Sequence, residues 1–87
     1  MEQKEEMQIG KVTHYFPKIG VAVVEVTSGS IKVGDEIRIK GHTTDFRQKV
    51  ASLQVEHEKL DIAEQGMSIG VKVDEPVRAH DLVYKEI

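Results

Sequence analysis

The sequence predicts an all-β fold, a small six-stranded β-barrel that is closed or nearly closed. Short runs rich in valine and isoleucine alternate with polar residues, turns that contain glycine or proline separate them, and no long amphipathic helix is apparent. The chain has 87 residues, which is enough for one hydrophobic core. Closing the sheet into a barrel removes the exposed edges of so small a sheet.

The first two predicted strands form a hairpin. We expect residues 1–6 to be a flexible polar tail and residues 7–87 to form the single barrel domain. The first strand covers residues 7–15 and the second covers residues 19–26, whose β-branched side chains disfavour a helix. Pro17 lies between them, where its fixed φ favours a turn.

The third strand, residues 36–40, begins with a turn signal. Gly34 can adopt the positive φ of a tight turn, and Asp35 can accept hydrogen bonds from nearby backbone amides. Ile37 and Ile39 then point to the core because alternate side chains of a strand share one face. The opposite, outward face carries Glu36, Arg38 and Lys40.

The second half of the chain supplies three more strands. We expect the fourth at residues 46–57, with a bulge or bend near Ser52, and the fifth and sixth at residues 69–73 and 81–85. Residues 58–66 form a longer link with room for a single helical turn. The side chains expected inside the barrel are Ile37, Ile39, Leu53, Ile69, Val71 and Val73.

Three segments carry a family resemblance. They are Val-Gly-Asp-Glu-Ile-Arg-Ile-Lys-Gly at residues 33–41, Val-x-Ser-Leu-Gln at residues 50–54, and Ala-x-x-Gly-x-x-Ile-Gly-Val at residues 63–71. The chain resembles the second-domain β-barrel of translational GTPases of the elongation factor Tu type. It resembles even more closely the barrel appended to collagenase-like peptidase-family proteins, through residues 9–15 and 40–46.

The sequence departs from these related barrels at one turn. They usually place glycine before the last aspartate, whereas this chain has Ala79-His80-Asp81. We therefore expect the last turn to differ.

The resemblance implies a non-catalytic, translation-factor-like binding module that contacts tRNA, rRNA or a ribonucleoprotein. The alternative is a protein-interaction module that serves a separate catalytic subunit, and a small enzyme is the weakest reading. GTP binding is not expected because the chain has no phosphate-binding loop of the Gly-x-x-x-x-Gly-Lys-Ser/Thr type.

Composition excludes several kinds of site. The net charge is −3, there is no cysteine, and no apolar run approaches the roughly 20 residues that span a bilayer. We therefore expect a cytoplasmic protein with no membrane contact, no cofactor and no catalytic residues. No metal site is expected either, because the four histidines follow no ligand spacing: His14, His42, His57 and His80.

The best candidate for RNA contact is a cluster of cations with one aromatic residue. Cations can bind phosphates, and an aromatic ring can stack on an unpaired base. The alternative is an ordinary solvated face that keeps the strands soluble, with Phe46 in the core. The candidate RNA-binding residues are Arg38, Lys40, His42, Phe46, Arg47 and Lys49.

Overall fold

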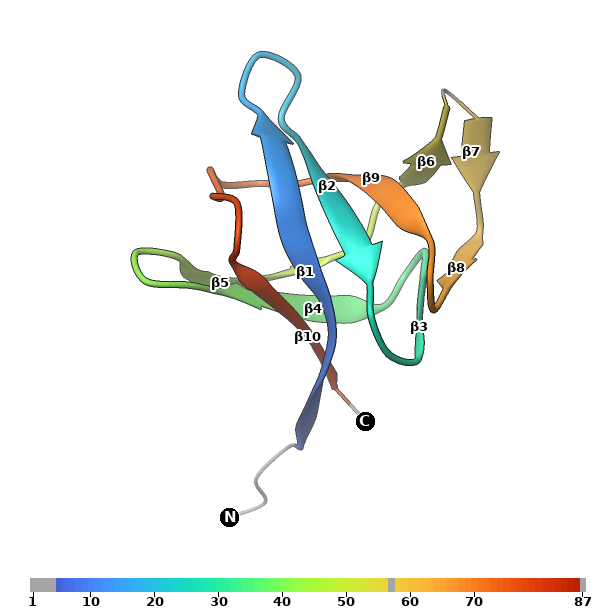
Figure 1. The fold of residues 1–87 in the computed structure, drawn as a ribbon, viewed down its shortest axis with the longest axis horizontal. Coiled ribbons are helices and arrows are strands. Elements are labelled where there is room, and N and C mark those ends of the chain that lie inside the picture. Colours follow the sequence, from blue (N-terminus) through green and yellow to red (C-terminus); the bar gives the residue numbers. More distant parts are fainter. Residues whose placement is uncertain (1–4, 57, 87) are drawn as a thin grey trace.

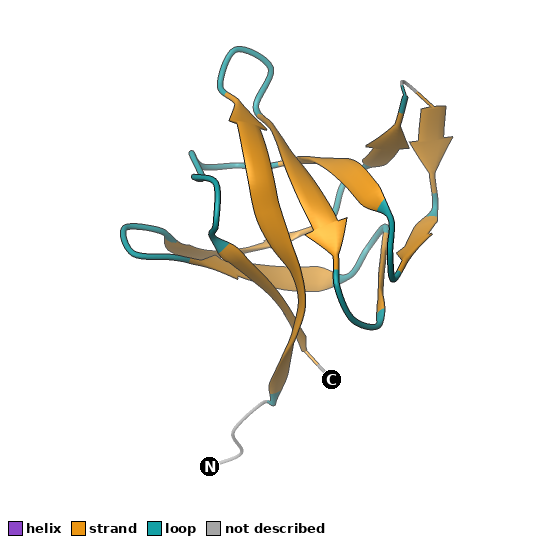
Figure 2. Cartoon of the chain, in the orientation of Figure 1, coloured by secondary structure: helices purple, strands orange, loops and turns teal. Residues whose placement is uncertain are grey.

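The computed structural model describes residues 5–56 and 58–86 and is all-β, as predicted. None of these residues is helical, so the described chain contains no helix that could cross a membrane. Figures 1 and 2 show antiparallel strands joined by turns. The strands are β1 (Glu6–Phe16), β2 (Val21–Val26), β3 (Ser30–Lys32), β4 (Glu36–Lys40), β5 (Asp45–Lys49), β6 (Leu53–Val55), β7 (Glu58–Leu60), β8 (Ile62–Glu64), β9 (Ser68–Lys72) and β10 (Leu82–Glu86).

The prediction of a six-stranded barrel, closed or nearly closed, was wrong in the number of strands and in closure. Eight of the ten strands form one sheet in the order β5-β4-β10-β1-β2-β9-β6-β7, and β3 pairs with β8 in a second sheet. The end strands β5 and β7 do not pair with each other among the described residues. The large sheet is therefore open rather than closed into a barrel.

The four strands that the sequence did not separate are β3, β6, β7 and β8, each three residues long. So short a segment shows no complete alternation of apolar and polar side chains, which is the signal used to predict strands. The predicted fourth strand is interrupted at residues 50–52, near the bend expected at Ser52. The link at residues 58–66 contains β7 and β8 and no helical turn.

The core contains the residues that the alternation of apolar and polar side chains predicted. All six residues expected inside, from Ile37 to Val73, are buried. The long strand β1 runs between β2 and β10, and its register shifts once against each of them. β1 begins at Glu6, one residue before the predicted start, and residues 1–4 of the expected tail lie outside the described part of the chain.

The turn before β4 has the geometry expected from its sequence. Gly34 has a φ of 96°, and an Asp35 carboxylate oxygen accepts a hydrogen bond from the Lys32 amide at 3.0 Å. The same oxygen lies 3.0 Å from the ammonium group of Lys85 on β10. Asp35 therefore fixes the turn and also ties it to a neighbouring strand.

The gap between β5 and the end of β9 is bridged by the side chain of Gln48. Its Nε2 donates to the Lys72 carbonyl at 2.8 Å, and its Oε1 accepts from the Asp74 amide at 2.7 Å. Gln48 is buried, so both hydrogen bonds are shielded from water. Side-chain hydrogen bonds thus join two segments that no strand ladder connects.

Candidate interaction surfaces

The predicted cation cluster lies on the outer face of β4 and β5. The two strands are antiparallel neighbours, and Arg38 lies directly opposite Arg47. Lys40 and Lys49 lie on the same face, as their alternation predicts. The structure therefore brings together the four cations that the sequence placed on adjacent strands.

Both arginines of this cluster are already paired with carboxylates. Arg38 makes two parallel hydrogen bonds of 2.8 Å to Asp45, and its Nη1 lies 3.1 Å from Glu6. The other oxygen of Glu6 lies 3.3 Å from Arg47, which also approaches Glu86 at 3.8 Å. Glu6 thereby offsets the repulsion between two arginines that face each other across the ladder.

This pairing shifts two pKa values. The hydrogen bonds from Arg38, with the attraction of its positive charge, hold the pKa of Asp45 below its usual range. The hydrogen bonds to Asp45 and Glu6 raise the pKa of Arg38 above its already high value. The guanidinium groups therefore offer less uncompensated charge to a phosphate than the sequence suggested.

The remaining members of the cluster are placed differently from one another. Among the described residues, none forms an ion pair with Lys40 or Lys49, and both lysines are exposed. His42 is also exposed, in the connection between β4 and β5. These three side chains remain accessible to a partner.

Phe46 does not share the face of the four cations. It lies opposite the buried Ile39 in the β4–β5 ladder and packs, half-buried, against the core. Its ring therefore points inward, away from Arg47, which is next to it in the chain. Of the two placements considered for Phe46, the structure shows the one in contact with the core.

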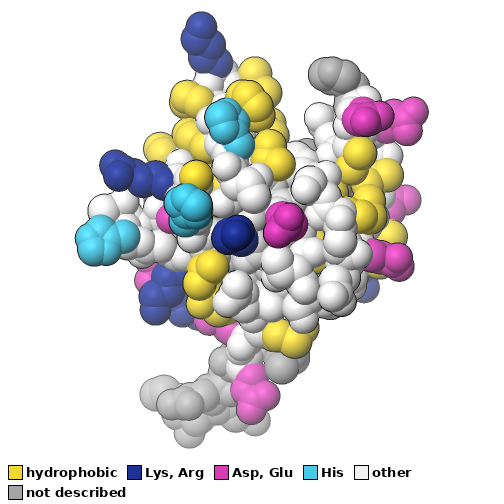
Figure 3. Space-filling view, in the orientation of Figure 1, with side chains coloured by type: hydrophobic (Ala, Val, Ile, Leu, Met, Phe, Trp, Pro, Cys, Tyr) yellow, Lys and Arg dark blue, Asp and Glu magenta, His cyan; other side chains and the backbone are white. Residues whose placement is uncertain are grey.

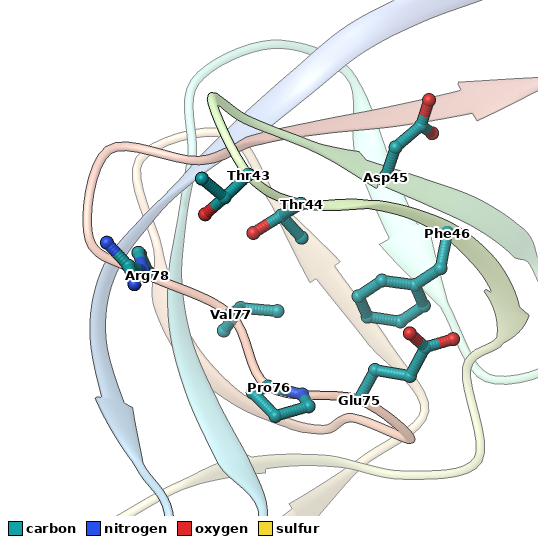
Figure 4. Close-up of a pocket in the computed structure, with 8 residues that line it drawn as sticks. All are labelled: Thr43, Thr44, Asp45, Phe46, Glu75, Pro76, Val77 and Arg78. Carbon is teal, nitrogen blue, oxygen red and sulfur yellow. The ribbon is translucent and has the colours of Figure 1, made fainter.

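Phe46 forms one wall of a pocket of about 470 Å³. The connection from β4 into β5 forms one side of the pocket, and residues 75–78 form the other (Figure 4). The sequence did not single out residues 75–78, because their contact with β5 depends on how the chain returns after β9. The lining residues are Thr43, Thr44, Asp45, Phe46, Glu75, Pro76, Val77 and Arg78.

A second surface that sequence reasoning missed is the tip of the β1–β2 hairpin. This hairpin projects from one end of the molecule (Figure 1), and hydrophobic side chains gather around it (Figure 3). Phe16 is 44% exposed and Ile19 is 58% exposed. The ring of His14 lies against Phe16, with centroids 4.4 Å apart. Phe16 and Ile19 together are called the hairpin tip below.

The described residues contain no group of three or more histidine, aspartate or glutamate side chains placed to hold a metal ion. His57 lies outside the described residues, so its predicted strand placement is not tested. Glu56, the residue before it, has a positive φ of 49°.

Residues 20–75 match the family model of elongation factor Tu domain 2. The chain belongs to the elongation factor Tu domain 2 family. This confirms the first of the two resemblances identified in the sequence. The match covers the segment from the β1–β2 turn to the loop after β9 and thus includes β4, β5 and the Gln48 bridge.

Named relatives connect the chain to peptidases. It is 37% identical over 83 residues to a collagenase of Porphyromonas gingivalis, which is 94% of this chain and 20% of the relative. It is 38% identical over 80 residues to an uncharacterized protease of Methanocaldococcus jannaschii, which is 91% of this chain and 19% of that protein. The chain therefore spans about a fifth of the length of the curated relatives it matches.

A solved structure agrees with this relationship. The C-terminal domain of a Geobacillus thermoleovorans protein assigned to the U32 peptidases is similar with a TM-score of 0.85 and 26% identity. The similarity covers 92% of each chain. The selenomethionine variant of the same domain has a TM-score of 0.82. The fold of this chain thus occurs as a discrete domain of a peptidase-family protein.

Proposed function

We propose that this chain is a non-catalytic docking module that serves the catalytic unit of a U32-type peptidase in the cytoplasm. One observation carries the proposal: nearly the whole chain corresponds to a small part of proteases several times its length. Segments outside this module would then supply the catalytic chemistry. The absence of a catalytic grouping in the sequence is consistent with such a division of labour.

The hairpin tip is the surface best suited to this docking. Phe16 and Ile19 are exposed on a projecting hairpin. Contact of these apolar side chains with water is unfavourable, and their burial by a partner would lower the free energy. Aromatic side chains are enriched among the residues that dominate protein interfaces. We place the contact with the catalytic unit here.

RNA docking through the β4–β5 face is the alternative function. Within the described part of the chain, only Lys40, His42 and Lys49 of the predicted cluster have no carboxylate partner, and Phe46 points inward. RNA affinity depends strongly on the number of phosphates neutralised by lysine and arginine. The pairing of both arginines therefore favours the protein-docking proposal over RNA contact.

The experiment is affinity capture with the tagged chain, with and without ribonuclease, followed by identification of what is retained. We expect retention of a U32-type peptidase that survives ribonuclease. The double variant Phe16→Ser and Ile19→Ser should lose it. The matched control is Val33→Ser with Ile62→Ser, which removes two exposed apolar side chains near the β3–β8 pair.

Two results would contradict the proposal. Retention that disappears on ribonuclease treatment would support the RNA alternative. Equal loss of the peptidase in both double variants would show that the hairpin tip has no special role. Thermal unfolding of each variant identifies any loss of capture that is caused by loss of the fold.

A further inference from the structure

Two backbone hydrogen bonds, one at each end of the β4–β5 ladder, show which of its residue pairs are hydrogen-bonded. At one end the Gly41 amide donates to the Thr44 carbonyl at 2.7 Å, and at the other the Val50 amide donates to the Asp35 carbonyl at 2.8 Å. Hydrogen-bonded and non-hydrogen-bonded pairs alternate along an antiparallel ladder. The pairs between these two ends are therefore assigned without ambiguity.

This alternation divides the residues of β5 into two classes. The backbone groups of one class bond to β4, and those of the other class point away from β4. Phe46 and Gln48 belong to hydrogen-bonded pairs, so their backbone groups bond to β4. Asp45 and Arg47 belong to the other class, and their N–H and C=O groups point away from β4. β5 is an end strand of the sheet, and no described residue pairs with the backbone of Arg47. β5 thus offers a free strand edge at Arg47, whereas the Lys49 carbonyl accepts a hydrogen bond from Gln48 Nε2 at 3.4 Å.

The free edge adjoins the pocket lined by Phe46. The wall opposite β5 consists of residues 75–78, with the apolar side chains of Pro76 and Val77 (Figure 4). A strand that pairs with β5 would turn alternate side chains toward Phe46. A volume of about 470 Å³ holds at least one such side chain with its backbone.

The outer face of β5 defines the charge of the added strand. The outward side chains of β5 are Asp45, Arg47 and Lys49. Asp45 is paired with Arg38, Arg47 is paired with Glu6 and Glu86, and no described residue forms an ion pair with Lys49. Opposite charges on directly neighbouring strands stabilise a sheet, and like charges destabilise it. An acidic side chain therefore complements Lys49 on the face opposite the pocket.

We propose that the edge of β5 accepts an extended peptide by strand addition, in which apolar side chains alternate with acidic ones. The apolar side chains enter the pocket beside Phe46, and the acidic ones lie on the outer face beside Lys49. Backbone hydrogen bonds to the strand edge supply affinity, and the two faces supply specificity. This site is separate from the hairpin tip and needs no peptidase.

The probe is a synthetic peptide in which valine and glutamate alternate, titrated into the isotopically labelled chain. We expect saturable shifts at the Arg47 and Lys49 amides and slower hydrogen exchange of the Arg47 amide. A valine–lysine peptide tests the charge complementarity, and the valine–glutamate peptide N-methylated at alternate residues tests the backbone pairing. Neither control should bind measurably.

Two variants of one position separate strand addition from simple charge attraction. Arg47→Ala removes the cation and keeps the backbone donor, whereas Arg47→Pro removes both. Proline is tolerated at this position because the Arg47 amide faces away from β4. We expect Arg47→Pro to raise the Kd roughly threefold to tenfold beyond Arg47→Ala, the contribution of one backbone hydrogen bond.

If Arg47→Ala and Arg47→Pro have equal melting temperatures and weaken peptide binding equally, the proposal is overturned. Charge attraction alone would then explain the binding. Undiminished binding of the N-methylated peptide would overturn it as well. Absence of binding by the valine–glutamate peptide to the wild-type chain would also refute it. None of these results bears on capture of a peptidase through the hairpin tip, so the two proposals fail independently.

Discussion

Gly41 lies directly against the carboxylate of Asp81, so that a Cβ atom at position 41 would overlap Asp81 Oδ1. Asp81 is buried, and its other oxygen accepts a hydrogen bond from the Arg78 amide at 2.9 Å. The end of β4 and the turn before β10 therefore meet at a point where only glycine fits. Gly41 and Asp81 are forty residues apart in sequence, and each determines the space available to the other.

Gly41→Ala should destabilise the fold by about 1–3 kcal/mol, because an overlap in a packed region is relieved only by shifting neighbouring atoms. Chemical denaturation with urea measures the change. The φ of Gly41 is not in the positive range, so the contact with Asp81, and not backbone strain, causes the cost. In the Asp81→Ala background the same substitution should cost much less. An unchanged cost in that background would refute the steric explanation.

His80→Gly should stabilise the protein by about 1 kcal/mol. His80 has a φ of 79°, a region in which side chains are strained and glycine is not. The departure noted in the sequence analysis, a histidine before Asp81, therefore coincides with a strained residue in the structure. Thermal unfolding provides the measurement. Ala79→Gly is the matched control and should stabilise nothing, because Ala79 has no positive φ.

Stability at acidic pH should depend on Asp45. Its pKa is lowered in the folded state by the hydrogen bonds from Arg38, so the unfolded chain binds the proton more readily. The contribution is present above the ordinary aspartate pKa of about 4 and is lost as the pH falls through the lowered value. Asp45→Asn should flatten stability over this acidic range and leave its pH dependence near neutrality unchanged. If Asp45→Asn leaves the fall in stability at acidic pH unchanged, the pairing of Asp45 with Arg38 is contradicted.

The RNA alternative makes a prediction about Lys40 and Lys49, which form no ion pair with a described residue. If RNA docks on the β4–β5 face, Lys40→Gln with Lys49→Gln should weaken binding and lower its log–log salt slope by about 0.7 for each lost phosphate contact. Fluorescence anisotropy with a labelled single strand at several salt concentrations measures both quantities. Lys18→Gln with Lys59→Gln is a control of equal charge. No RNA binding at low salt would identify the face as an ordinary solvated surface.

The sequence predicted the parts of the fold that follow from alternation and turn chemistry. Ile37 and Ile39 were placed in the core, and Gly34 was placed in a turn that requires positive φ. The openness of the sheet was not predicted, because closure depends on whether the two end strands approach each other. β5 instead makes side-chain hydrogen bonds from Gln48 to Lys72 and Asp74, which are distant from it in sequence.

The candidate site was predicted as a set of positions but not as an electrostatic environment. Strand parity correctly placed Arg38 beside Arg47 on one outer face. Their partner Glu6 was assigned to a tail, because a polar segment without alternation gives no strand signal. Asp45 could have been identified as a partner of Arg38 from the hairpin register. Glu86 could not, because β10 reaches this face only through the tertiary fold.

The Gln48 bridge has a consequence for how a substitution acts on this junction. A closed barrel opens only by breaking a ladder of backbone hydrogen bonds in concert. Here, two hydrogen bonds from the single side chain of Gln48 join β5 to the end of β9 among the described residues. One substitution at this position therefore removes both bonds at once, whereas no single side chain carries a backbone ladder.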